Sequence, residues 1–195
     1  MNKKILIVYY TDSGSTKEVA TVLATQLQAN IVNIYEIKET LNIEEDFIIF
    51  CTPNKFGKPA KPLINFITAN KKELIKRKLS VCFTCMDCYD YPENEQNHSC
   101  MVYKDSWFSK QTKELKTMNS WEKSHSVSVY LDTLKQLLHT DIHSIAFFKG
   151  KLSFKNLKFF DALTMRFISF IKPTIKQGYY LKKEDIKSWA EVIMK

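Results

Sequence analysis

The stretch KILIVYYTDSGSTKEVA, residues 4–20, decides the fold that the rest of the chain is expected to adopt. Residues 5–10 form a continuous run of aliphatic and aromatic side chains, which is typical of a parallel strand covered on both faces. Small hydroxyl residues and one glycine follow at 11–16. Apolar residues then recur at helical spacing from Glu18 to Leu27. The predicted order is strand, hydroxyl-rich loop and helix.

The loop between this strand and this helix is a predicted anion site. A helix start leaves backbone N–H groups without partners and carries a partial positive charge, so a loop that enters it can cradle a phosphate. Gly14 lets the backbone come close, and hydroxyls are supplied by Thr11, Ser13, Ser15 and Thr16. A helix cap needs only one such side chain. This density of hydroxyls therefore favours phosphate binding over simple capping.

The form of the loop separates it from other phosphate-binding motifs. The chain contains neither G-x-x-x-x-G-K-[ST] nor G-x-G-x-x-G, which disfavours a nucleotide hydrolase and a dinucleotide fold. The segment TDSGST at 11–16 instead resembles the [ST]-x-[ST]-G-x-T loop with which flavodoxins hold the phosphate of FMN. The resemblance implies FMN as the cofactor, bound by Thr11, Asp12, Ser13, Gly14, Ser15 and Thr16.

Strands and helices alternate along the remaining chain. Further strands are expected at 30–37, 46–51, 79–84 and 144–148, and helical stretches after Pro62, at 126–139 and at 184–190. Alternation of this kind predicts an α/β fold with a doubly wound parallel sheet. The flavodoxin resemblance implies five parallel strands in the order 2-1-3-4-5, with a long insertion after the fourth strand at about 86–125. Residues 1–195 are expected to form one domain.

Two more loops are expected to flank the phosphate loop. Ligands of such sheets lie outside the carboxyl ends of the strands at the switch point, here between the first and third strands. The resemblance implies that the loops after the third and fourth strands enclose the isoalloxazine ring. Ordinary packing is the alternative for the three aromatic residues of this set. The expected residues are Thr52, Pro53, Asn54, Phe56, Gly57, Thr84, Cys85, Tyr89 and Tyr91.

Composition narrows the class of protein. No apolar run approaches the roughly 20 residues that span a bilayer, and no signal peptide is expected. Five cysteines without a framework spacing predict a reducing cytoplasm. The net charge of +8 comes from 29 basic and 21 acidic residues, but the basic residues are dispersed and no nucleic-acid module is present, so no nucleic-acid partner is expected.

The spacing of the cysteines only weakly indicates a metal-binding site. Cys82, Cys85 and Cys88 form C-x-x-C-x-x-C, but an iron–sulfur cluster needs a fourth ligand, and the next cysteine, Cys100, is twelve residues further on. Cys82 also lies within a predicted buried strand, which cannot curl around a cluster. Zinc is disfavoured at the later cysteines, and so is metal binding by His139 and His143. No metal site is therefore expected.

Two unusual segments are candidates for contacts with binding partners. The polar insertion at 86–125 contains Trp107, Phe108 and Trp121, and we expect it to form a lid or a partner surface beside the flavin. Residues 157–172 form an extra apolar helix surrounded by basic residues. It is expected either to contact the inner face of the membrane peripherally or to be buried under the insertion.

The tail carries a second resemblance. Gly150-Lys151-Leu152, Phe160-Asp161 and the segment ending at Trp189 are similar to the tail of bacterial menaquinone-dependent protoporphyrinogen oxidases, which are membrane-associated FMN proteins. The spacing from Asp185 to Trp189 departs from that pattern. The resemblance implies a cytoplasmic, quinone-linked FMN oxidoreductase, for which no catalytic residue can be named. The alternatives are a non-enzymatic electron carrier that docks on a redox partner and a binding module that has lost the cofactor.

Overall fold

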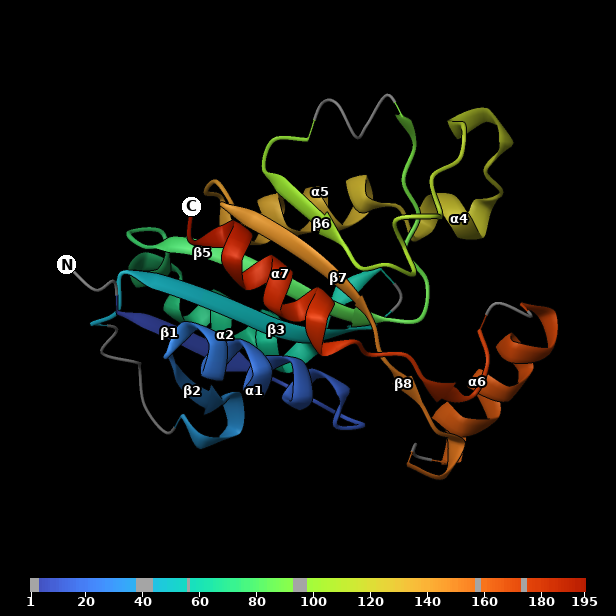
Figure 1. The fold of residues 1–195 in the computed structure, drawn as a ribbon, viewed down its shortest axis with the longest axis horizontal. Coiled ribbons are helices and arrows are strands. Elements are labelled where there is room, and N and C mark those ends of the chain that lie inside the picture. Colours follow the sequence, from blue (N-terminus) through green and yellow to red (C-terminus); the bar gives the residue numbers. More distant parts are fainter. Residues whose placement is uncertain (1–3, 38–43, 56, 93–97, 157–158, 173–174) are drawn as a thin grey trace.

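A mostly parallel sheet with helices on both faces forms the centre of the molecule (Figure 1). The computed structural model describes residues 4–37, 44–55, 57–92, 98–156, 159–172 and 175–195. The strands lie in the order β2-β1-β3-β5-β7-β6, and each neighbouring pair is parallel. This confirms the predicted α/β fold, because the five expected strands lie in the order 2-1-3-4-5. In chain order the strands are β1 (Ile5–Tyr9), β2 (Asn30–Asn33), β3 (Phe47–Lys55), β5 (Lys78–Cys85), β6 (Met101–Lys104) and β7 (Ser144–Lys149).

Alternate residues of the central strands face two separate hydrophobic cores. On one face, Ile7 and Ile49 pack with α1 (Ser15–Leu27) and α7 (Lys183–Ile193). On the other face, Val8 and Phe50 pack with α2 (Lys61–Leu74) and α5 (Val127–Leu138). Every residue of β1 is buried, as expected for a strand that is covered on both sides.

The structure corrects the expected ends of two strands. The second strand, expected to reach residue 37, ends at Asn33, whose side chain accepts from the Tyr35 amide and starts the short 3-10 helix η1 (Ile34–Glu36). The third strand continues beyond residue 51 to Lys55. It then pairs antiparallel with β4 (Lys58–Pro59), so the region expected as an irregular loop is a hairpin.

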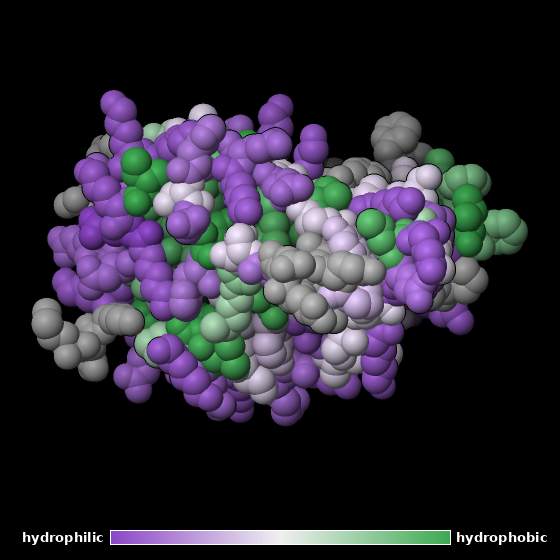
Figure 2. All heavy atoms as spheres, turned by 90° about the horizontal axis from the view of Figure 1, so that it is seen from above, coloured by the Kyte–Doolittle hydropathy of each residue, from purple (hydrophilic) through white to green (hydrophobic). Residues whose placement is uncertain are grey.

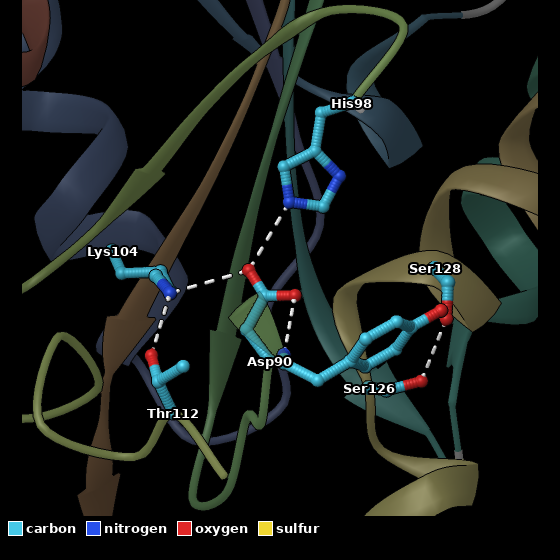
Figure 3. A network of polar contacts seen from close by, with 7 residues as sticks. Asp90, His98, Lys104, Thr112, Ser126 and Ser128 are labelled. Carbon is cyan, nitrogen blue, oxygen red and sulfur yellow. Dashed lines mark hydrogen bonds and ion pairs between the residues drawn. The ribbon is translucent and has the colours of Figure 1, made fainter. Parts of the chain in front are cut away.

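The insertion at 86–125 is folded rather than an irregular loop. Its strand β6 extends the sheet beyond β7, and Phe108 is fully buried. The buried Asp90 carboxylate binds Lys104 Nζ at 3.2 Å and contacts His98 Nε2 at 3.1 Å (Figure 3). These contacts join segments of the insertion that lie 8 and 14 residues apart in the chain, and so they hold its parts together. Further elements of this region are η2 (Leu115–Thr117) and α4 (Ser120–Ser124).

A helical arm leaves the sheet after β7. The chain continues through β8 (Lys151–Leu152) and η3 (Phe154–Asn156) into α6 (Phe159–Ile171), and β9 (Gly178–Tyr179) returns antiparallel to β8. Figure 1 shows α6 standing apart from the helices that cover the sheet. Among the described residues, none of the helices has both the length and the apolar character needed to cross a bilayer.

Candidate functional site

The start of α1 presents unpaired backbone amides. Its N-cap residue is Gly14, at φ 94°, and no side chain caps the helix. The amides of Ser15, Thr16 and Lys17 have no hydrogen-bond acceptor among the described residues. Together with the partial positive charge of the helix start, this array suits an anion. The predicted phosphate loop therefore leads into a helix start whose unpaired amides can bind an anion.

The loop hydroxyls do not all play the same part. Thr11 Oγ1 accepts from the Gly14 amide at 2.9 Å and shapes the turn. Ser15 Oγ accepts from the Lys151 amide at 2.9 Å, and Thr16 Oγ1 lies 2.7 Å from Thr84 Oγ1 at the end of β5. The Ser13 hydroxyl has no partner within the described part of the chain. Ser13 is thus the loop side chain best placed to donate to a ligand.

A cavity of about 220 Å³ opens beside this loop. It lies at the carboxyl ends of β1, β3 and β5, where the switch point was predicted. Its walls are more apolar than polar, and they bring together the phosphate loop, two further loops, the insertion and α6. The lining residues that were predicted from the sequence are Asp12, Ser13, Ser15, Pro53, Asn54, Thr84 and Cys85.

Residues that the sequence did not single out as ligands also line the cavity. Trp121 of α4 and His125 stack with ring centroids 4.2 Å apart and an interplanar angle of 17°. Helix α6 contributes Met165 and Ile168. A flat ring system can stack on such a pair and pack against the apolar α6 side chains. The insertion therefore supplies an aromatic wall.

Several predicted site residues do not line the cavity, among them Thr11, Gly14 and Thr16 of the loop itself. Thr52 is buried and holds the hairpin, because its Oγ1 accepts from the Ala60 amide at 3.0 Å. Gly57 turns the hairpin at φ 79°, and a Cβ there would come within 3.0 Å of Ser124 O. Neither Tyr89 nor Tyr91 lines the cavity. The prediction for Phe56 falls outside the described residues.

The position of Tyr89 has a clear physical cause. After Asp87 the chain pairs with the segment before α5, since the Tyr89 amide donates to His125 O at 3.0 Å and Val127 donates to Tyr89 O at 2.9 Å. Tyr89 is therefore buried within the insertion, with Lys113 Nζ 5.9 Å from its ring centroid. The aromatic ring of the insertion that lines the cavity is that of Trp121.

Burial raises the pKa of two ionisable groups of the cavity wall. Burial raises the pKa of the Cys85 thiol well above its ordinary value, so this thiol is protonated at neutral pH. Burial also raises the pKa of Asp87, whose Oδ2 accepts from Trp121 Nε1 at 3.1 Å. Its Oδ1 is buried without a hydrogen-bond partner among the described residues. A carboxyl group in this setting can hold a proton close to a bound ligand.

The raised pKa of Asp87 predicts a pH-dependent effect of Asp87→Asn on stability. Burial penalises the ionised carboxylate, so its contribution to stability is fully present below the unfolded pKa and is lost as pH rises through the folded pKa. The groups that face it are Trp121, His125, Tyr89 and Lys149. Asparagine cannot ionise but can still accept from Trp121. The free energy of unfolding of the variant should therefore rise relative to the native chain as pH increases from about 4, the ordinary pKa of an aspartate, through the raised pKa of Asp87.

Urea unfolding across this range measures the difference. The control is Asp132→Asn, the same substitution on the exposed face of α5. A difference for Asp87→Asn that is flat, or that falls with pH, would contradict the assignment.

Comparison with known proteins agrees with this geometry. A family model described as a flavodoxin domain matches residues 6–177. A flavodoxin of Buchnera aphidicola is 30% identical over 95 residues, and the match spans 47% of this chain and 56% of that protein. A structure from Bacteroides eggerthii, assigned as a flavoprotein, covers 99% of both chains with a TM-score of 0.50 at 11% identity. A flavoprotein of Lactobacillus acidophilus in complex with FMN is similar at 16% identity and a TM-score of 0.45, covering 74% of this chain and 93% of that one.

Proposed function

This chain belongs to the flavodoxin domain family, and we propose that it is an FMN-dependent oxidoreductase acting on a flat, apolar substrate of the quinone type. Its cofactor is FMN. The observation that carries the proposal is the cavity, which joins the unpaired amides at the start of α1 to an apolar, aromatic wall formed by α4 and α6. An anionic phosphate and a flat ring system need these two environments side by side.

The residues present fit the phosphate end of FMN. The amides of Ser15, Thr16 and Lys17 and the Ser13 hydroxyl have no acceptor or donor partner in the described part of the chain, so they can bind phosphate oxygens without breaking an existing bond. A Cβ built on Gly14 would meet nothing within 4 Å, so the loop is open at this residue. The phosphate loop is therefore built to receive an anion.

The other end of the cavity fits an apolar ring. Leu152, Met165, Ile168 and Ile175 form one side, and the stacked rings of Trp121 and His125 form another. These residues exclude water and orient a flat molecule, while FMN supplies the electron or hydride chemistry when it is bound. Asp87 also lines the cavity, and burial raises the pKa of its carboxyl group, which favours the protonated form.

The substrate class rests on the α6 wall together with the resemblance of the tail. The α6 side chains Met165 and Ile168 give the cavity an apolar wall, which suits a hydrophobic ring, and this favours a quinone as the electron acceptor. The similarity of residues 150–152 and of Trp189 to menaquinone-dependent protoporphyrinogen oxidases makes protoporphyrinogen the electron donor to test first.

The proposal is tested in two steps on the purified full chain. The first is the visible absorption spectrum, with identification of the flavin released on denaturation. We expect FMN, and a protein that neither carries nor takes up FMN would refute the site. The second is turnover with a water-soluble quinone as acceptor and protoporphyrinogen as donor. A flavin-loaded protein without turnover, which instead exchanges electrons with redox proteins, would be an electron carrier.

Removal of the Ser13 hydroxyl should weaken FMN binding. Because this hydroxyl has no partner among the described residues and lines the cavity, it can donate to a charged phosphate, a bond worth about 1.5–3 kcal/mol. We therefore expect Ser13→Ala to raise the Kd by roughly 10- to 100-fold. The matched control is Thr21→Ala, which removes a hydroxyl that donates only to Lys17 O on the same helix. Titration of the apoprotein with FMN measures both variants, and an unchanged Kd for Ser13→Ala would remove this residue from the site.

A further inference from the structure

Helix α6 carries an exposed apolar stripe. Phe170 is 86% exposed, Phe167 64%, Leu163 59% and Ile171 55%. Their spacing of i, i+4, i+7 and i+8 places them on one side of an α-helix. Figure 2 shows hydrophobic side chains at the end of the molecule where Figure 1 places α6. Soluble surfaces rarely gather large apolar residues in this way without a partner.

A neighbouring side of α6 lines the cavity. Thr164, Met165 and Ile168 are centred about a third of a turn away from the exposed stripe. The apolar residues of the cavity side are explained by the cavity that they line, whereas those of the outward-facing stripe have no such explanation.

The surroundings of the stripe are strongly basic. Between residues 151 and 180 the sequence has six basic residues and one acidic residue. Lys151, Lys155, Arg166 and Lys176 have exposed side chains. An apolar stripe flanked by cations matches the boundary between acyl chains and anionic headgroups. The same charge pattern would repel a second copy of this chain, because both copies would bring a basic rim to the contact.

We propose that α6 lies in the surface of an anionic lipid bilayer, with Leu163, Phe167, Phe170 and Ile171 inserted among the acyl chains and the basic residues on the headgroups. At 13 residues the helix extends about 20 Å, which suits lying in the interface rather than crossing the bilayer. The proposal goes beyond the cofactor and substrate assignments and does not depend on them.

Cosedimentation of the full chain with vesicles tests the stripe. We expect the protein to pellet with vesicles containing phosphatidylglycerol, more weakly as salt is raised, and far less with phosphatidylcholine alone. Phe167→Ser with Phe170→Ser should lower the partition coefficient on the order of 100-fold, because two inserted aromatic side chains are lost. The control pair is Ile75→Ser with Leu115→Ser, since Ile75 and Leu115 are 47% and 43% exposed on other elements.

A second pair of variants tests the charge. Lys155→Gln with Lys176→Gln should lower the partition coefficient about 25-fold, whereas Lys187→Gln with Lys195→Gln, exposed on and after α7, should have little effect. Sedimentation velocity without lipid accompanies each variant. Protein that stays in the supernatant at low salt, binding equal on neutral vesicles, or control pairs that lose as much binding would each overturn the proposal. So would a dimer without vesicle binding that only the stripe variants dissociate.

Discussion

Gly14→Val is expected to weaken FMN binding by about 100-fold or more. Gly14 adopts φ 94°, which a β-branched residue avoids. The variant can relieve this strain only by rotating the backbone between Ser13 and Ser15. That rotation breaks the bond from the Gly14 amide to Thr11 Oγ1 and turns the unpaired amides away from a common point. Loss of two bonds to a charged phosphate, at about 1.5–3 kcal/mol each, gives this magnitude.

The other end of the same helix provides a matched control. Gln28 follows α1 at φ 50°, so Gln28→Val imposes strain of the same kind far from the cavity. Both variants should lose stability by a similar amount, about 1–2 kcal/mol, but only Gly14→Val should lose FMN affinity. Urea unfolding and FMN titration measure the two quantities separately. Equal FMN affinities for the two variants would show that the loop does not hold the phosphate.

The phosphate loop and the sheet could be predicted because their signals are local. The apolar run of β1, the hydroxyls around Gly14 and the helical spacing after Glu18 lie within one short stretch. The roles of the individual hydroxyls could not be predicted in this way. Ser15 and Thr16 find their partners at Lys151 and Thr84, which only the folded chain brings near.

The structure of the insertion, in contrast, could not be predicted from local sequence signals. Its strand β6 has no long periodic pattern, and it is positioned by buried contacts such as Asp90 with Lys104 and His98. One local signal for α4 was present in the sequence. Asn119 and Glu122 form a capping box, which marks the helix start that places Trp121 in the cavity wall.

Tyr89 does not line the cavity, for a related reason. The loop after β5 was expected to keep its aromatic residues beside the ring, because it leaves the carboxyl end of a central strand. The chain instead turns away at Asp87 to pair with the segment before α5. Pairing between segments almost forty residues apart leaves no trace in local composition.

Asp105→Ala is expected to lower the free energy of unfolding by about 3–5 kcal/mol. The Asp105 carboxylate is 2% exposed, and its Oδ1 accepts from the amides of Trp107 at 2.9 Å and Phe108 at 3.0 Å. Its Oδ2 accepts from the Lys149 amide at 2.6 Å. Alanine removes this carboxylate acceptor from the three amides. The Phe108 amide keeps its bond to the backbone oxygen of residue 105 at 3.1 Å, whereas the Trp107 and Lys149 amides lose their bonds to the carboxylate, each worth about 1.5–3 kcal/mol.

Loss of the Asp105 hydrogen bonds should also disturb the cavity, because these bonds lie next to residues that line it. Asp105 joins the insertion to the end of β7, directly before Gly150, Lys151 and Leu152, which line the cavity. We therefore expect Asp105→Ala to weaken FMN binding and to speed hydrogen exchange at the three amides. Asp185→Ala is the control, since the Asp185 carboxylate is only half-buried and, within the described residues, accepts from the Ser106 amide and hydroxyl. This variant should cost less than about 1.5 kcal/mol. Equal costs for the two variants would mean that the insertion is held to β7 by its buried side chains, such as Phe108, rather than by this carboxylate.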